Sequence, residues 1–148
     1  MFDTVTFTDR LAEQMTSYGY DAKILAEKIG VSVSTIYNFL KGRYTQPSTN
    51  IFLNLIEHFN CSADYMLGLV EFPENASYFP PLRSYGKRLR ELLKSRQLTQ
   101  KAFIEQMKVS SNLVYRWLSD ETVPTIEYLI KIANFFEITV DALIERTK

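Results

Sequence analysis

The chain has 148 residues, of which 46% are hydrophobic and 23% charged, and its formal net charge is zero. This composition is typical of a globular protein with a buried core, and it excludes a disordered chain and a broadly basic surface. A single cysteine and a single histidine exclude an internal disulfide framework and an ordinary zinc site, so we expect no metal and no cofactor.

The sequence begins without a basic segment or an apolar run of signal-peptide length, and no window approaches the ~20 apolar residues that span a membrane. We therefore expect a cytoplasmic protein with no membrane partner. No nucleophile with a base, no paired carboxylates and no phosphate-binding loop can be seen in the sequence. An enzyme, and hence a catalytic residue, is not expected.

Five helices are predicted in the first part of the chain, over residues 3–17, 21–28, 32–41, 48–59 and 62–67. Apolar residues recur at helical spacing, and Asp21 and Ser48 stand where helices begin. Gly30 followed by Ser32 indicates a helix that ends in a left-handed turn and restarts at a sharp angle. A helix in that setting is suited to entering a DNA groove.

The linker that follows, residues 69–82, contains three prolines, which disfavour helix. It also contains apolar side chains that are poorly suited to water, among them Phe72, Tyr78 and Phe79. We therefore expect the linker to lie over one or both neighbouring units and to fix their orientation.

The second half of the chain repeats the first. A shift of 78 residues aligns Arg10 with Arg88, and a shift of 77 aligns Asp64 with Asp141. The repeat predicts five more helices, over residues 82–95, 99–106, 110–118, 125–136 and 139–145. The predicted fold is all-α, with one domain at 1–68, a linker at 69–82 and a second domain at 83–148.

Each unit resembles the Cro and phage-repressor helix-turn-helix family, also called XRE-like. The first unit carries the resemblance in Ala26, Gly30, Val31, Ser32, Ile36, Gly42, Pro47, Asp64 and Leu67, and the second in Thr99, Gln100, Val109, Ser110, Val114, Pro124, Ile132, Ala133 and Asp141. The resemblance implies two tandem five-helix domains. It also implies that the third helix reads the major groove while the start of the second helix and the loop after the third hold phosphates.

Carried onto this sequence, the resemblance implies base contacts from Val33, Ser34, Thr35 and Asn38, and from Ser111, Asn112, Leu113 and Arg116. It implies phosphate contacts from Lys41, Arg43, Tyr44, Gln100 and Lys101, and from Tyr37 and Tyr115 on the third helices. These types suit the task, because Asn can pair with adenine and Arg with guanine.

Four positions that bear on DNA binding depart from the family pattern. Ala22 stands where the family has a glutamine that meets phosphate, and Lys108 replaces the turn glycine, which implies left-handed strain unless the turn is rebuilt. Asp120 and Glu121 stand where the first unit has Gly42 and a basic residue, and their charge would oppose phosphate.

A basic run lies on the predicted first helix of the second unit. Its charges ring the helix instead of forming one stripe, so we interpret them as a solvated face. The run comprises Arg83, Lys87, Arg88, Arg90, Lys94 and Arg96.

Two functions stay open. The first is a sequence-specific regulator of transcription, expected to be a repressor, that binds double-stranded DNA as a homodimer or as a monomer on two half-sites. The alternative is a regulator of the anti-repressor or antitoxin kind, in which one or both units no longer bind DNA and bind a protein partner instead. The seven acidic against five basic side chains of residues 1–70 would allow this alternative.

Overall fold

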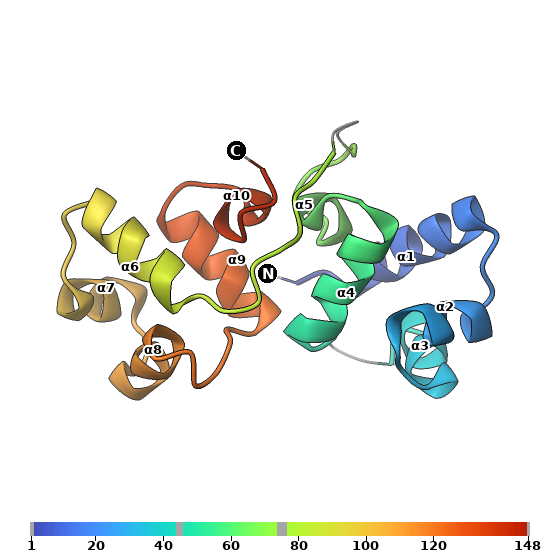
Figure 1. Ribbon diagram of the computed structural model, residues 1–148, viewed down its shortest axis with the longest axis horizontal. Coiled ribbons are helices and arrows are strands. Elements are labelled where there is room, and N and C mark those ends of the chain that lie inside the picture. Colours follow the sequence, from blue (N-terminus) through green and yellow to red (C-terminus); the bar gives the residue numbers. More distant parts are fainter. Residues whose placement is uncertain (1, 44–45, 74–76, 148) are drawn as a thin grey trace.

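The computed structural model describes residues 2–43, 46–73 and 77–147, and every regular element in these ranges is an α-helix. The predicted all-α fold is therefore confirmed. Figure 1 shows the helices in two groups, which we call unit one and unit two. Unit one consists of α1 (Thr4–Tyr18), α2 (Ala22–Ile29), α3 (Val33–Leu40), α4 (Thr49–Phe59) and α5 (Ala63–Met66).

Every helix of unit one begins at a polar residue whose side chain accepts a hydrogen bond from a backbone N–H of the first turn. These N-caps are Asp3, Asp21, Ser32, Ser48 and Ser62. Each one satisfies a donor that the helix itself leaves free, and such caps commonly stabilise a helix by about 1 kcal/mol. Each cap depends only on residues within a few positions of the helix start. The helices of this unit could therefore be predicted from the sequence to within a few residues.

Unit two consists of α6 (Gly86–Ser95), α7 (Gln100–Met107), α8 (Ser111–Leu118), α9 (Ile126–Phe135) and α10 (Val140–Leu143). The prediction for α6 was wrong at its start, since the helix begins at Gly86 and not at Leu82. The Leu82 N–H donates to the Ile144 carbonyl at 3.0 Å, and the Tyr85 hydroxyl donates to the Leu82 carbonyl at 2.7 Å. These bonds hold the segment along the C-terminal chain and outside the helix.

The two units share their left-handed turns. Five positions with positive φ in unit one recur in unit two at the shift of the repeat. The pairs are Gly19 with Gln97, Gly30 with Lys108, Gly42 with Asp120, Asn60 with Glu137, and Gly68 with Glu145. Four of the five are glycine in unit one and none is in unit two, so unit two carries backbone strain that unit one avoids.

Aromatic rings fill the core of each unit. In unit one Phe7 packs edge-on against Phe39, with ring centroids 5.8 Å apart. In unit two Trp117 is 1% exposed, as expected from its place on the inner face of α8, and it packs against Tyr128 at 5.2 Å. The buried apolar residues of both units form one continuous cluster.

The described part of the linker touches both units, as predicted. The Tyr78 N–H donates to Asn60 Oδ1 of unit one at 3.4 Å, and the Phe79 N–H donates to the carbonyl of Arg146 in unit two at 3.0 Å. The expected burial of its apolar side chains was wrong in part, because Phe72 is 76% and Phe79 50% exposed. Main-chain and polar contacts, more than these rings, attach the linker to the units.

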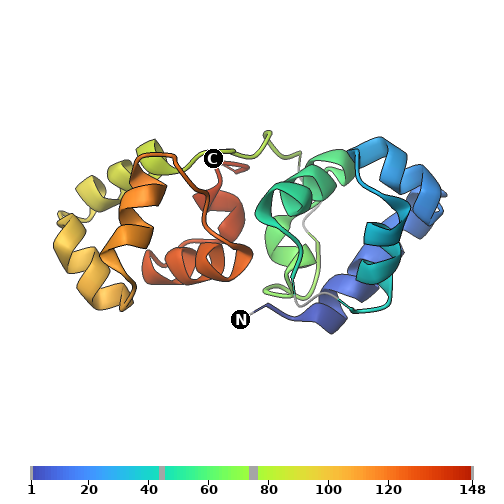
Figure 2. The ribbon, with the colours of Figure 1, turned by 90° about the horizontal axis from the view of Figure 1, so that it is seen from below.

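Figures 1 and 2 show the units side by side, with α4 and α5 of unit one facing α9 and α10 of unit two. The helices α5 and α10 pack directly against each other. The helices α2 and α3 lie at one end of the lower edge in Figure 1, and α7 and α8 lie at the other end.

Candidate nucleic-acid interface

The turn between α2 and α3 has the geometry of a helix-turn-helix. Gly30 ends α2 in a left-handed conformation, with φ of 73°, and its N–H donates to the Ala26 carbonyl at 2.9 Å. Ser32 then begins α3 by accepting a hydrogen bond from the Thr35 N–H at 3.2 Å. The two helices pack against each other, so α3 is held at a fixed angle on the surface.

The outer face of α3 carries the predicted base-contacting residues with unequal exposure. Ser34 is exposed, whereas Val33, Thr35 and Asn38 are half-buried. Val33 packs partly against the core, and the Thr35 hydroxyl is bonded to that of Ser32 at 2.8 Å. Ser34 is therefore the most open of the four.

The loop after α3 brings the other predicted residues of unit one together. The Lys41 ammonium lies 5.8 Å from the ring centroid of Tyr37, which is 50% exposed. Arg43 Nη1 donates to Asn38 Oδ1 at 3.4 Å. The exposed cations of the loop thus lie directly beside the outer face of α3, while Tyr44 falls outside the described residues.

The start of α2 is less suited to phosphate than the loop. Ala22 is 6% exposed and contributes to the core, so it cannot replace the glutamine that the family has there. Asp21 caps the helix, and its Oδ1 accepts from the Ile24 N–H at 2.8 Å. The carboxylate occupies the helix N-terminus at which an anion would otherwise bind.

The same motif in unit two is built without glycine. Lys108 adopts φ of 56° at the end of α7 and its N–H donates to the Ile104 carbonyl, as Gly30 does to Ala26. Ser110 begins α8 by accepting from the Leu113 N–H at 3.1 Å. The turn is therefore kept and not rebuilt, and the strain expected at Lys108 is present.

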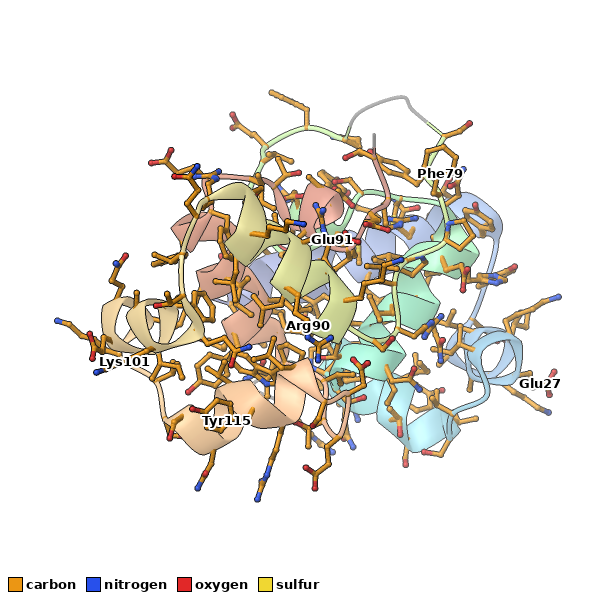
Figure 3. The ribbon with its side chains drawn as sticks, turned by 60° about the vertical axis from the view of Figure 1, so that its left-hand side comes forward. Glu27, Phe79, Arg90, Glu91, Lys101 and Tyr115 are labelled. Carbon is orange, nitrogen blue, oxygen red and sulfur yellow. The ribbon has the colours of Figure 1, made fainter. Side chains whose placement is uncertain are left out.

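The predicted residues of unit two are mostly exposed. Ser111, Asn112, Tyr115 and Arg116 lie open on α8, with Tyr115 53% exposed, whereas Leu113 packs partly against the core. Gln100 and Lys101 are exposed at the start of α7, where the cap is the uncharged Thr99. Figure 3 shows Lys101 on α7 and Tyr115 on the neighbouring α8.

The acidic loop of unit two has a structural role that the sequence did not reveal. Asp120 Oδ1 accepts a hydrogen bond from the Gly86 N–H at 2.8 Å, which satisfies the start of α6. A Cβ on Gly86 would lie 2.4 Å from the Leu118 carbonyl oxygen, so only glycine permits this approach. The charge of Asp120 is thus directed at a helix N-terminus within the protein.

The basic run was interpreted as a solvated face, but three of its arginines also bind other parts of the protein. Their guanidinium groups donate to carbonyls at the C-terminal ends of other helices, where such acceptors lack helical partners. Arg88 donates to Ala142 and Leu143, Arg90 to Leu118, and Arg96 to Phe136. Five of the six side chains are exposed, all but Arg88, so the interpretation as a solvated face holds in part.

The histidine side chain contacts a neighbouring tyrosine, and the cysteine is buried. His58 Nε2 lies 2.9 Å from the Tyr20 hydroxyl, and burial raises the pKa of the Cys61 thiol to about 12. Among the described residues there is no group of three metal-ligating side chains, and no helix there is long and apolar enough to cross a membrane.

Comparisons with known proteins agree with this geometry. Residues 11–66 match a family model described as helix-turn-helix, and residues 86–147 match a second one described as a helix-turn-helix domain. Over 60 residues, or 40% of the chain, the sequence is 33% identical to the HTH-type transcriptional activator BcrR of Enterococcus faecalis. The aligned part covers 29% of that relative's length. No solved structure gives a significant match. The matched segments fall on units one and two, so the chain carries two helix-turn-helix domains in tandem, consistent with a pair of Cro/XRE-like units.

Proposed function

We propose that the protein is a sequence-specific regulator of transcription that binds double-stranded DNA through α3, and through α8, in the major groove. The observation that carries this proposal is the preformed turn before α3, with an exposed basic loop directly after it. A rigid helix with polar side chains supplies base contacts, and adjacent cations supply the phosphate contacts that dominate affinity.

The two units would hold phosphate in different ways. In unit one the contacts come from the loop, through Lys41 and Arg43, because the capping carboxylate of Asp21 opposes an anion at the start of α2. In unit two the loop is acidic, and the contacts come from Gln100 and Lys101 at the start of α7. Each unit thus keeps one of the two phosphate sites that the family pattern implies.

Repression is the proposed mode of regulation, since a protein that occupies a promoter blocks access to it. The Enterococcus faecalis relative carries the name of an activator, and it shares only the 60 aligned residues with this chain. A promoter–reporter assay with and without the protein distinguishes the two directions. We place the regulator with its DNA in the cytoplasm and propose no enzymatic activity, as is typical of helix-turn-helix regulators.

The test is a titration of DNA binding against salt concentration. For the wild-type protein, log affinity for mixed-sequence duplex DNA should fall linearly with log salt, with a slope of about −0.9 for each phosphate contact. Lys41→Ala and Arg43→Ala should each reduce the magnitude of the slope by about 1. Lys94→Ala is the matched control, because it removes one positive charge from an exposed position in the last turn of α6, at the end of that helix away from α8.

An unchanged slope in the Lys41 and Arg43 variants would remove the loop from the proposed interface. If the wild-type protein bound no duplex even at low salt, the alternative of a protein-binding regulator would replace this proposal. The acidic groups at the start of α2 and after α8 would then belong to a protein interface.

A further inference from the structure

A reciprocal pair of aspartates joins the two units. Asp141 of α10 accepts hydrogen bonds from the backbone N–H groups of Ala63 at 2.8 Å and Asp64 at 3.3 Å, at the start of α5. Asp64 in turn accepts from the N–H groups of Val140 at 3.0 Å and Asp141 at 2.8 Å, at the start of α10. Each short helix is therefore capped by the aspartate of the other.

This exchange has the form of an interface between two identical subunits. Ala63 and Val140 occupy equivalent positions of the repeat, as do Asp64 and Asp141. The contact of Ala63 with Asp141 is therefore matched by the equivalent contact of Val140 with Asp64. Such self-complementary contacts are typical of a two-fold axis between protein chains. Here the axis lies within a single chain, between α5 and α10.

Further contacts close the interface on both sides of this pair. The side chain of Arg146 is 1% exposed, and its guanidinium donates to the Ile56 carbonyl of α4 at 3.2 Å and to that of Cys61. The Thr49 hydroxyl, at the other end of α4, donates to the Pro124 carbonyl at 2.6 Å. The surfaces that two separate chains would need for this kind of pairing are therefore already covered, each by the other unit of the same chain.

The two DNA-facing helices are consequently held at one fixed separation and orientation. In Figure 1 both α3 and α8 lie along the lower edge of the molecule, on either side of the α5–α10 contact. The side chains that they present are different. Ser34 and Asn38 of α3 correspond in the repeat to Asn112 and Arg116 of α8.

We propose that one chain acts as an intramolecular pseudo-dimer that occupies both halves of a single asymmetric DNA site, with α3 on one half-site and α8 on the other. A symmetric dimer of identical units binds a palindrome. Two unlike helices on one rigid body require two unlike half-sites. This inference rests on the proposed function, and it favours the monomer on two half-sites over the homodimer, both of which the sequence left open.

The first experiment selects bound duplexes from a random pool with the full-length protein and weighs the complex by sedimentation. We expect two unlike half-sites and one chain per duplex. A palindrome with two chains per duplex would overturn the inference and leave the proposed function intact. If no duplex is selected even at low salt, the proposed function fails as well.

The second experiment changes the spacing between the selected half-sites. An insertion of 5 base pairs turns one half-site to the other side of the duplex, and an insertion of 10 restores the side but separates the halves by about 34 Å more. A rigid pseudo-dimer should bind both duplexes no more tightly than a single half-site. Full affinity for the duplex with 10 inserted pairs would show that the units bind as independent modules.

The third experiment assigns a helix to each half-site, and its two variants serve as controls for each other. Asn38→Ala should relax base preference in one half-site only, and Arg116→Ala in the other only, each by roughly 5- to 150-fold at one position. If either variant relaxed both half-sites, one helix would be reading both of them. That result requires two chains and contradicts the pseudo-dimer.

Discussion

At the scale of single residues, the two units form the same left-handed turns with different residues. A residue with a Cβ in the left-handed conformation costs about 1–2 kcal/mol, and glycine avoids this cost. Gly30 and Lys108 hold equivalent turns, with φ of 73° and 56°. The ideal Cβ position on Gly30 has no neighbour within 4 Å, so backbone strain is the main effect of a side chain there.

Lys108→Gly should therefore raise the free energy of unfolding by about 1 kcal/mol. The relief of strain exceeds the entropy that a glycine adds to the unfolded chain, which is about 0.4–1 kcal/mol. Urea denaturation measures the change. The mirror variant Gly30→Ala should lower the same free energy by a similar amount. A loss of stability in both variants would mean that the Lys108 side chain makes contacts that outweigh its strain.

At the scale of helices, the sequence predicted what depends on neighbours along the chain. Caps such as Ser32 and Ser110 and the apolar periodicity are local, so the helices and both turns were predicted nearly in full. Contacts between distant helices could not be read in this way. Arg10 and Arg88 coincide in the repeat, but their shared role, donating to carbonyls of the fifth helix of each unit, depends on packing.

For the candidate site, too, features that depend on neighbouring residues were predicted and long-range contacts were not. The turn and the exposed loop of unit one followed from the sequence, because Gly30 and the basic residues act where they stand in the chain. The role of Asp120 did not, since its partner Gly86 lies 34 positions away. The reciprocal hydrogen bonds of Asp64 and Asp141 could not be predicted either, because they join distant residues. The recurrence of this aspartate at equivalent positions of the repeat did, however, mark it as a residue with a shared role.

The contact between α5 and α10 should make stability depend on pH. Burial and the neighbouring carboxyl of Asp141 raise the pKa of Asp64 to about 6, from an ordinary value near 3.9 in the unfolded chain. Between about pH 4 and 6 the folded protein then binds more protons than the unfolded chain. Its free energy of unfolding therefore falls, through this group, as pH rises across that range.

Asp64→Asn lacks this titration, so its free energy of unfolding should fall less than that of the wild type as pH rises from 4 to 7. Urea denaturation at intervals of pH gives both curves, and their difference isolates the group. Asp9→Asn, at an exposed position of α1, is the matched control and should follow the wild-type curve. Parallel curves for Asp64→Asn and the wild type would contradict a raised pKa at Asp64.

At the scale of the whole molecule, the two units stabilise each other. A unit of about 65 residues buries a small core and is marginally stable alone. Unit two also carries five side chains in left-handed turns, so it depends more on the shared interface than unit one does. The continuous apolar cluster and the buried guanidinium of Arg146 connect the units, and we expect the wild-type chain to unfold in one cooperative transition.

Arg146→Ala should break this cooperativity. It leaves the Asp141 carboxylate buried without its cation, which lies 3.5 Å away, and leaves two carbonyls of unit one without that donor. Removing one partner of a buried pair costs about 3–5 kcal/mol. The single tryptophan, Trp117, lies in unit two, so its fluorescence reports that unit while circular dichroism reports both.

In the wild type the two signals should change at the same urea concentration, and in Arg146→Ala the fluorescence should change first. Arg83→Ala is the control, because its ion pair with Glu57 at 2.9 Å is 40% and 44% exposed and contributes at most about 1 kcal/mol. That variant should keep the two signals together. Coincident transitions in Arg146→Ala would show that α5, α10 and the apolar cluster couple the units without the arginine, and the rigid arrangement of α3 and α8 would then depend on the aspartate exchange.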